Sequence, residues 1–343
     1  MVRVGFHNSH EQVHPSALLA ATQLAEQRGF DAAMCSDHWA PWQSTQGHSG
    51  FAWTWLGSAL ATTRLPFGVV NAPGQRYHPA IIAQAAATLA AMYPGRFWVA
   101  LGSGENMNEH ITGDGWLPKP VRDARLVECV EVIRALLDGE EVTHDGLVKV
   151  DRAKLWTLPD VKPLLIGPAV SVVTAANHAR WADGLVTVNQ PEEKLRRVVD
   201  AYRDAGGRGE IALQVHVSFA PTDAEALRLA REQWAGNAIG PPVAWDLDTP
   251  EAFDQIAGLV SDDVLRRSVL VEHDPQRLAD RLVALAGIGF DAVYLHQVAT
   301  DVVPSDDKHP DAADTATQPS SSLEAFVDMA AEHVLPALKA VGA

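Results

Sequence analysis

The sequence predicts an α/β fold, a (β/α)8 TIM barrel, and three observations carry this prediction. A short apolar strand followed by a helix-length amphipathic segment repeats eight times along the 343 residues. Such alternation needs crossover connections and buries both faces of each strand, as in a parallel barrel. Barrels of this kind commonly reach such a length as one domain. An open, doubly wound sheet is the structural alternative.

The elements of the first half follow one another in a regular order. The predicted strand and helix pairs are VRVGF with 15–28, AAMCS with 51–62, LPFGVV with 79–92, and RFWVAL with 121–138. Each strand is rich in apolar residues, and each helix segment places apolar residues on one side at a period near 3.6.

The second half supplies four further pairs. They are PLLIG with 171–180, DGLVTV with 192–205, IALQVHV with 223–236, and DAVYLHQV with 322–338. The phrases AEQRGFDAA and VALAGIGFDAVY share a layout in which a glycine ends a helix just before a strand, which indicates a recurring unit.

Two stretches interrupt the pattern. Residues 237–274 form an insertion before a helix that starts near Pro275. Residues 299–322 are polar and proline-containing, which is typical of a mobile loop. No segment resembles an interdomain linker, so we expect one barrel domain over residues 1–343.

Composition excludes several classes of partner. The formal net charge of −16, without a concentrated basic patch, argues against binding to nucleic acid or to an anionic membrane surface. No apolar run approaches the roughly 20 residues of a spanning helix, and MVRVGFHNSH lacks signal-peptide features, so we expect a cytoplasmic protein. Cys35 and Cys129 form no disulfide framework and are expected to be buried and reduced.

The stretch CSDHWAPW follows the second predicted strand. In a barrel, catalytic groups lie where strands end at the carboxyl face, so Asp37 and His38 are placed at a site. His38 can act as a general base near neutral pH, and Asp37 can orient it or anchor a cofactor. Trp39 and Trp42 can supply a flat apolar wall for a ring. The alternative is an ordinary aromatic cluster that caps the barrel.

The fourth strand ends in ALGSGENMNEH. Gly102, Ser103 and Gly104 permit a ligand to approach the backbone closely. Glu105 follows as either a catalytic acid or a helix-capping acid, with Asn108 beyond it. The full spacing of a dinucleotide fingerprint is missing.

Other polar residues at strand ends leave a rival function open. Glu11, Asn71 and His296 follow or end further strands. Histidines could also converge on one ion in a barrel metal hydrolase, although HNSH lacks the His-x-His spacing. The candidate ligands are His7, His38, His216 and His296.

Several ordered motifs together resemble one known family. They are HEQ near the amino terminus, SDHWAPW, and QRYHPAIIAQAAATLAAMYPGRFWVALGSGENMNE. They are similar to the luciferase-like flavin and deazaflavin oxidoreductases, most closely to the branch of the coenzyme F420-dependent glucose-6-phosphate dehydrogenases. The similarity is dense from residue 2 to about residue 140 and continues more loosely to the end.

The resemblance implies a barrel enzyme, commonly a homodimer, that acts on a small-molecule substrate. His38 matches the base that removes the alcohol proton, and Trp42 matches the residue that stabilises the developing intermediate. Glu105 matches the acid that serves the reduced cofactor ring, and Glu11 matches a further active-site carboxylate. Loss of the hydroxyl proton eases departure of the hydride, which is consistent with these roles.

The resemblance also implies which residues contact the cofactor. Asp37 and Asn108 match such contacts, and Val70 and Asn71 match the strand-three region behind the ring. Gly167, in LLIGPAVS, stands at the end of the fifth strand, where relatives wrap the cofactor phosphate.

Departures from that branch alter the expected cofactor. In the fifth strand, Pro168 lacks an amide hydrogen and Val170 adds bulk, which disfavours a phosphate nest. The chain therefore resembles a subgroup that uses ordinary flavin, and FMN is favoured over coenzyme F420, which remains the alternative. A non-catalytic flavin-binding protein is a more remote alternative.

Departures also bear on the substrate. TVNQPEE and TPEAFDQIAG contain no lysine to bind a substrate phosphate, and Arg267 alone matches a family arginine. We therefore expect a neutral alcohol, sugar or terpenoid-like substrate rather than a sugar phosphate, bound by Trp39 and Arg267. Trp53 and Trp55 suit such a substrate unless they belong to the core.

Overall fold

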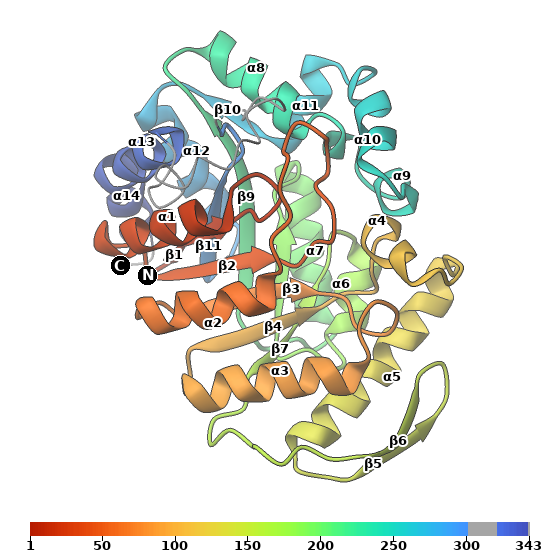
Figure 1. The fold of residues 1–343 in the computed structure, drawn as a ribbon. Helices are drawn as coiled ribbons and strands as arrows, with labels where there is room; N and C mark the ends of the chain where they lie inside the picture. Colours follow the sequence, from red (N-terminus) through yellow and green to blue (C-terminus); the bar gives the residue numbers. More distant parts are fainter. Residues whose placement is uncertain (301–320, 342–343) are drawn as a thin grey trace, which may run out of the picture.

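The computed structural model describes residues 1–300 and 321–341, and its centre is a closed barrel of parallel strands (Figure 1). The barrel order is β1-β2-β3-β4-β7-β8-β9-β11, and β11 pairs with β1 to close it. The barrel prediction is confirmed. The strands are β1 Arg3–Asn8, β2 Ala32–Ser36, β3 Phe67–Asn71, β4 Phe97–Leu101, β7 Leu164–Pro168, β8 Gly184–Val188, β9 Ile211–Phe219 and β11 Ala292–Gln297.

Helices surround the barrel, and their bounds lie within a few residues of the predicted ones. Helix α5 begins at Lys119, two residues earlier than predicted, because Pro120 is tolerated in a first helical turn. The outer helices are α1 Pro15–Gln27, α2 Ala52–Thr62, α3 Pro79–Met92, α5 Lys119–Leu137, α6 Val172–His178, α7 Glu192–Asp204, α8 Asp223–Trp234, α12 Pro275–Ala286, α13 Ser321–Met329 and α14 Leu335–Lys339. A π-helical turn, Ala330–Val334, joins the last two.

The interior of the barrel is filled near the amino ends of its strands. A Cβ atom at Gly5 would lie 2.2 Å from the Tyr294 ring, and one at Gly68 would lie 1.9 Å from the Trp98 ring. The two glycines therefore make room for two large rings, whose centroids are 6.1 Å apart. These two rings occupy the interior of the barrel near the amino ends of its strands.

The predicted insertion, residues 237–274, is mostly helical. A second apolar cluster around Phe253 and Trp234 joins it to the barrel, and Trp42 belongs to the same cluster. The final strand of the segment, β10, pairs with β9 outside the closed barrel. Its elements are a 3-10 turn Asn237–Ile239, α9 Val243–Asp246, α10 Pro250–Ala257, α11 Asp262–Ser268 and β10 Leu270–Glu272.

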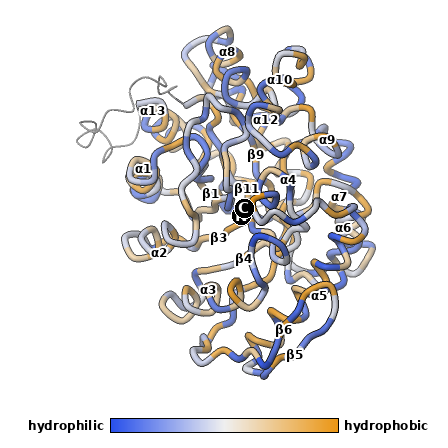
Figure 2. Tube along the Cα trace, turned by 45° about the vertical axis from the view of Figure 1, so that its right-hand side comes forward, coloured by the Kyte–Doolittle hydropathy of each residue, from blue (hydrophilic) through white to orange (hydrophobic). Residues whose placement is uncertain are grey.

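An antiparallel hairpin, β5 Val142–Asp145 with β6 Lys149–Ala153, was not predicted. Asp145 pairs with Lys149, and the three-residue loop 146–148 between them is held by a hydrogen bond from the Gly146 N–H to the Val148 carbonyl. Its residues are mostly polar and exposed, so no apolar run marks it as a strand. Figures 1 and 2 show the hairpin at the opposite end of the molecule from α8 and α10, and Figure 2 colours the tube by hydropathy.

Part of the predicted mobile loop, 299–322, is described. Ala299 and Thr300 are buried, and Ser321 already belongs to α13. Residues 301–320 lie outside the described residues. Cys35 and Cys129 are buried and free, as expected. In the described ranges, no helix has the length and apolar character needed to cross a membrane.

Candidate active site

A cavity of about 510 Å³ opens at the carboxyl ends of the barrel strands. Seven of the eight barrel strands contribute residues to its wall, and the eighth, β4, is represented by the residues that directly follow it, from Gly102 to Glu105. The insertion covers part of the cavity through Ile239, Pro241 and Val264. This volume is typical of small-molecule sites, and the place is where barrel enzymes hold their ligands.

Asp37 follows directly from β2, whose apolar residues are buried between the barrel and its helices. Its backbone N–H still pairs with the Val70 carbonyl of β3, at 3.0 Å, so the acid is fixed at the end of the strand. Its Oδ2 accepts hydrogen bonds from Asn71 at 2.8 Å and from Trp53 Nε1 at 3.2 Å. Its Oδ1 is buried without a partner in the described part of the chain.

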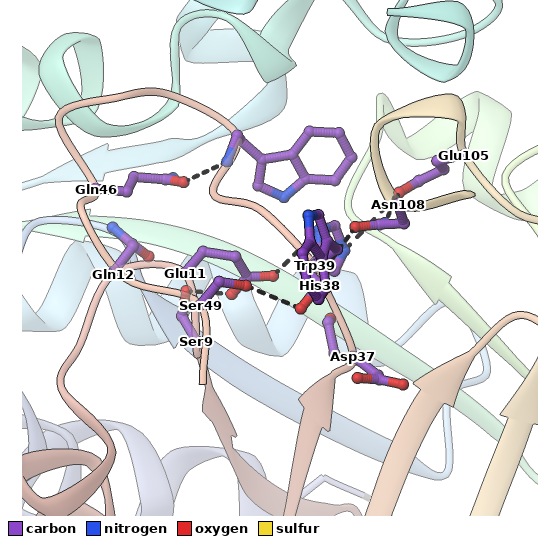
Figure 3. A network of polar contacts seen from close by, with 12 residues as sticks. Ser9, Glu11, Gln12, Asp37, His38, Trp39, Gln46, Ser49, Glu105 and Asn108 are labelled. Atoms are coloured by element: carbon purple, nitrogen blue, oxygen red, sulfur yellow. Dashed lines mark hydrogen bonds and ion pairs between the residues drawn. The ribbon is translucent and has the colours of Figure 1, made fainter. Parts of the chain in front are cut away.

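His38 lies between two carboxyl groups (Figure 3). Its Nδ1 is 3.6 Å from Glu11 Oε1, and its Nε2 is 3.8 Å from Glu105 Oε2. Both distances exceed a hydrogen bond, so the ring is not committed to either acid. Ser9 donates a hydrogen bond to Glu11 at 2.9 Å and holds that carboxyl in place.

Burial sets the protonation states of these three groups. It lowers the pKa of His38 to about 3, and the positive charge of Arg76 acts in the same direction. It raises the pKa of Glu11 to about 7 and that of Glu105 to about 8, where Glu11 and Glu109 add repulsion. At neutral pH the imidazole is therefore neutral and can accept a proton, while Glu105 holds one.

Trp42 and Asn108 complete this side of the site. The Trp42 ring lies 4.8 Å from the His38 ring, centroid to centroid, and lines the cavity. Asn108 Nδ2 donates to Glu105 at 3.3 Å, and its Oδ1 accepts from the Trp39 backbone at 2.8 Å. Asn108 belongs to the short helix α4, Asn106–Glu109, which a 3-10 turn, His110–Thr112, continues.

The four tryptophans that were grouped in the sequence separate in the structure. Trp53 and Trp55 are buried in the main core, which contradicts a role in contacting substrate. The Trp39 side chain is 56% exposed and lies outside the cavity wall formed by the described residues. Of these four tryptophans, only Trp42 lines the cavity, where it packs in the apolar cluster that includes Phe253 of the insertion.

Arg76 is a site residue that sequence reasoning missed. Its guanidinium donates to the Asp37 carbonyl at 2.7 Å and lies 3.6 Å from Asp37 Oδ2 and 3.8 Å from Glu109 Oε1. Its backbone N–H donates to Glu109 at 2.7 Å. The only signal was a charged residue within the loop that follows β3, in NAPGQRYHP.

The end of β7 differs from the expected cofactor contact. Gly167 is buried, and a Cβ there would lie 2.6 Å from the His178 ring, so this glycine makes room for a side chain. It does not line the cavity with the described residues, whereas Pro168, Ala169 and Val170 do.

Cations line the cavity in greater number than the sequence suggested. Arg267 of α11 lines it, as expected, and so do Lys119 of α5 and Lys194 of α7. The expectation of a single cation was therefore wrong, because Lys194 directly follows TVNQPEE, which itself contains no lysine.

The four histidines of the rival metal-site hypothesis do not form a ligand cluster. His7 and His296 stack at 4.5 Å with 21° between their planes, so their nitrogens do not converge. Among the described residues, no group of three or more His, Cys, Asp or Glu side chains is arranged to hold a metal ion.

The wall fits the polar edge and flat face of a ring cofactor. Asp37, Asn71 and Asn108 place carboxylate and amide groups along one side of the cavity wall, and such groups can pair with the polar edge of a ring. Val70 and Gly102 line the cavity beside them and carry no polar side chain. Asp37, Asn71 and Asn108 are the side chains that could hold the cofactor.

Comparison with known proteins gives a consistent result. The sequence model of the family described as "Luciferase-like monooxygenase" matches residues 1–292. The F420-dependent glucose-6-phosphate dehydrogenase of Beutenbergia cavernae is 32% identical over 99% of this chain and 98% of its own. The F420-dependent hydroxymycolic acid dehydrogenase of Mycobacterium tuberculosis is 37% identical over 61% of this chain and 60% of its own.

A solved structure shows the same arrangement of elements. It is an F420-dependent secondary alcohol dehydrogenase in complex with an F420-acetone adduct. It has a TM-score of 0.85 and 29% identity, and it covers 98% of this chain and 99% of that one.

Proposed function

The chain belongs to the luciferase-like monooxygenase family and is an oxidoreductase, and on this premise we propose that it is an F420-dependent dehydrogenase that moves a hydride between a carbinol carbon and the cofactor. The sequence alone favoured FMN. The relatives named above support coenzyme F420 instead. The observation that carries the reaction type is a neutral His38 between Glu11 and Glu105 at the cavity wall.

Of the residues that line the cavity, some transfer protons and others position the reacting groups. When bound, the cofactor accepts or supplies the hydride. His38 takes the hydroxyl proton of the alcohol at a ring nitrogen, because burial keeps the imidazole neutral. The Trp42 ring packs beside the His38 ring at 4.8 Å and gives this part of the cavity an apolar wall.

The two carboxyl groups beside His38 have different roles: Glu105 supplies a proton to the cofactor, and Glu11 stabilises the charge on His38. Glu105 holds a proton at neutral pH and can deliver it to the reduced ring, since its pKa is raised to about 8. Glu11, across the imidazole, stabilises the His38 cation that forms when the proton is taken. Asp37 and Asn108, which line the cavity, would hold the polar edge of the cofactor.

We propose a small neutral alcohol as the substrate. The insertion covers the cavity with apolar side chains such as Ile239, Pro241 and Val264, which suit an alkyl group. The similar solved structure is named a secondary alcohol dehydrogenase.

A sugar phosphate is the second candidate, and one observation favours it. Lys194 and Arg267 both line the cavity and could pair with a phosphate. The relative in Beutenbergia cavernae is named for glucose-6-phosphate.

One assay separates these possibilities. The purified protein is supplied with F420 or FMN and tested with 2-propanol, larger secondary alcohols and glucose-6-phosphate. Reduction of F420 by a neutral alcohol supports the proposal, and a preference for glucose-6-phosphate supports the second candidate. Binding without turnover of any substrate would indicate a cofactor-binding protein instead. We also propose a homodimer, on the family resemblance, which the elution volume in gel filtration tests.

A further inference from the structure

Glu105, the proposed proton donor, is carried by a backbone segment with little support of its own. It follows Gly104, whose φ of +86° lies in the left-handed region that favours glycine. It precedes α4, Asn106–Glu109, a helix of only four residues. Helices shorter than about 12 residues are marginal in water without tertiary contacts. The position of Glu105 in the cavity therefore depends on contacts that this segment makes with other elements.

Arg122 of α5 holds the residue that comes directly before Glu105. Its Nη1 donates to the Gly104 carbonyl at 3.0 Å, and its Nε donates to the Leu117 carbonyl at 2.9 Å. Its guanidinium also stacks on the Trp116 ring, with Cζ 3.9 Å from the ring centroid. The Arg122 side chain is only 3% exposed, so these contacts are sheltered from solvent. Arg122 therefore fastens Gly104 to the loop that precedes α5.

Asp246, the last residue of α9, meets the same group of residues from the insertion. Its Oδ1 accepts a hydrogen bond from Trp116 Nε1 at 2.8 Å and lies 4.0 Å from Arg122 Nη2. Its backbone carbonyl accepts from Nδ2 of Asn106 at 3.0 Å, and Asn106 directly follows Glu105 in the chain. Both neighbours of Glu105 are therefore linked to Asp246, one through Arg122 and the other directly.

The same short helix also helps to cover the cavity. Ala244 and Trp245, the two residues before Asp246, line the cavity wall, and α9 lies beside α4 (Figure 1). Asp246 itself does not line this cavity among the described residues, and its side chain is 61% exposed. Asp246 thus joins the cover of the cavity to the segment that carries Glu105, without reaching the cavity.

Resting on the proposed function, we propose that Asp246 is a positioning residue that sets the place of Glu105 relative to the covered cavity. It acts through Trp116, Arg122 and Asn106 rather than on the substrate or the cofactor. A proton donor must lie within hydrogen-bond reach of the atom that it serves, and a misplacement of about 1 Å can lower a rate strongly. Loss of Asp246 should therefore impair turnover more than binding.

The first test separates turnover from binding. For Asp246→Ala we expect kcat to fall about tenfold, while KM for the alcohol and the affinity for F420 change by about threefold or less. Asp246→Asn keeps an oxygen that can accept from Trp116, so it should restore most of kcat. Asp248→Ala is the matched control, because Asp248 is an exposed acid of the same segment that lies outside the cavity wall formed by the described residues. Thermal melts show that each variant is folded.

The second test asks whether Asp246 acts through Glu105. In a double-mutant cycle, Asp246→Ala should lower kcat about tenfold in the wild-type background and about twofold or less in the Glu105→Gln background. A merely structural role would lower kcat by the same factor in both. Trp116→Phe removes the donor to Asp246 but keeps a ring beside Arg122, so it should resemble Asp246→Ala. It takes the place of that variant in the cycle if Asp246→Ala does not fold.

The outcomes are distinguishable. Equal factors in the two backgrounds, or a kcat of Asp246→Ala within about twofold of the wild type, overturns the inference. A raised KM for the alcohol with unchanged kcat would do so too, because it would assign Asp246 to substrate binding. A wild-type protein that reduces FMN rather than F420 refutes the proposed cofactor, and the same cycle run with FMN still tests Asp246. A wild type that turns over no alcohol refutes the proposed function and this inference with it.

Discussion

The Nδ1 atom of His38 lies 3.6 Å from Oε1 of Glu11, close enough for a charge to be felt and too far for a hydrogen bond. The Nδ1 atom of His38 is therefore not hydrogen-bonded to Glu11, and burial keeps the imidazole ring neutral. The Glu11 carboxyl group lies beside this ring. This pairing suits a base that is charged only after it has taken a proton.

Removal of that base should abolish most of the activity. We expect His38→Ala to lower kcat about a hundredfold or more with cofactor affinity largely unchanged, since Asp37 and Asn108 remain. Steady-state rates and a cofactor titration check this. His333→Ala, at a partly exposed histidine of the π-helical turn that does not line the cavity, is the matched control. Wild-type turnover in His38→Ala would remove His38 from the mechanism.

The pH profile of alcohol oxidation should have two limbs near neutral pH, both set by the carboxyl groups beside His38. His38 keeps its base form down to a low pH because its pKa is about 3, so the acid limb should follow the ionisation of Glu11, whose pKa is about 7. Glu105 loses its proton above its pKa of about 8, so the rate should fall there. Glu105→Gln should lower the rate and remove the alkaline limb. An acid limb that remains near pH 6.5 in Glu11→Gln would contradict the assignment of His38.

Acid should destabilise the protein through its buried histidines. His10 is fully buried, neither ring nitrogen has a partner in the described chain, and burial lowers its pKa to about 4. The unfolded chain binds this proton below pH 6.5, so stability is complete above pH 7 and falls as the pH drops toward 4.

The contribution of His10 can be isolated with a variant. At pH 4 it should amount to about 3 kcal/mol at most, and His10→Leu should flatten the curve of unfolding free energy against pH between 6.5 and 4. Glu11 and Glu105 have raised pKa values and oppose this trend in both proteins, so the difference between them is the quantity to measure. Equal slopes would show that His10 is not held neutral.

Arg76 should be needed to assemble the site. Arg76→Met leaves Asp37 and Glu109 buried without their cation, so we expect a loss of about 3 kcal/mol or more in stability and weaker cofactor binding. Arg76→Lys keeps the positive charge but lacks the planar set of N–H donors of the guanidinium. It should therefore restore part of the stability and part of the cofactor affinity. Thermal melts and cofactor titrations provide the comparison. A stable Arg76→Met protein with normal cofactor affinity would show that Arg76 is not needed to assemble the site.

The two substrate classes should respond differently to loss of a cation. Arg267→Ala should leave KM for a neutral alcohol within about twofold, because no charge is involved. If glucose-6-phosphate is a substrate, its KM should rise about tenfold or more. A large increase in KM for the neutral alcohol would point to a packing role of Arg267 at the cavity wall.

The barrel could be predicted because each strand is a continuous apolar run and each helix has a clear period. Helix α7 is an example, with Leu195, Val198, Val199 and Tyr202 buried on one side. The hairpin β5–β6 was missed because its residues are polar and exposed. Two short strands made mostly of polar residues show no alternation of apolar and polar residues from which a strand could be predicted.

The site could be predicted only where a motif stood at the end of a strand. His38 and Glu105 were found this way, and both line the cavity. Arg76 and Lys194 could not be assigned, because their importance depends on which strands and helices meet across the barrel. Gly167 was taken for a ligand contact although it makes room for His178, a neighbour supplied by α6.

The most direct measurement is hydride transfer to F420 itself. Wild-type protein is mixed with F420 and a neutral secondary alcohol such as 2-propanol without oxygen, and the visible absorbance of the oxidised cofactor is followed. We predict its loss with the wild type and about a hundredfold slower loss with His38→Ala. Reduction of bound FMN but not of F420 by these alcohols would contradict the account.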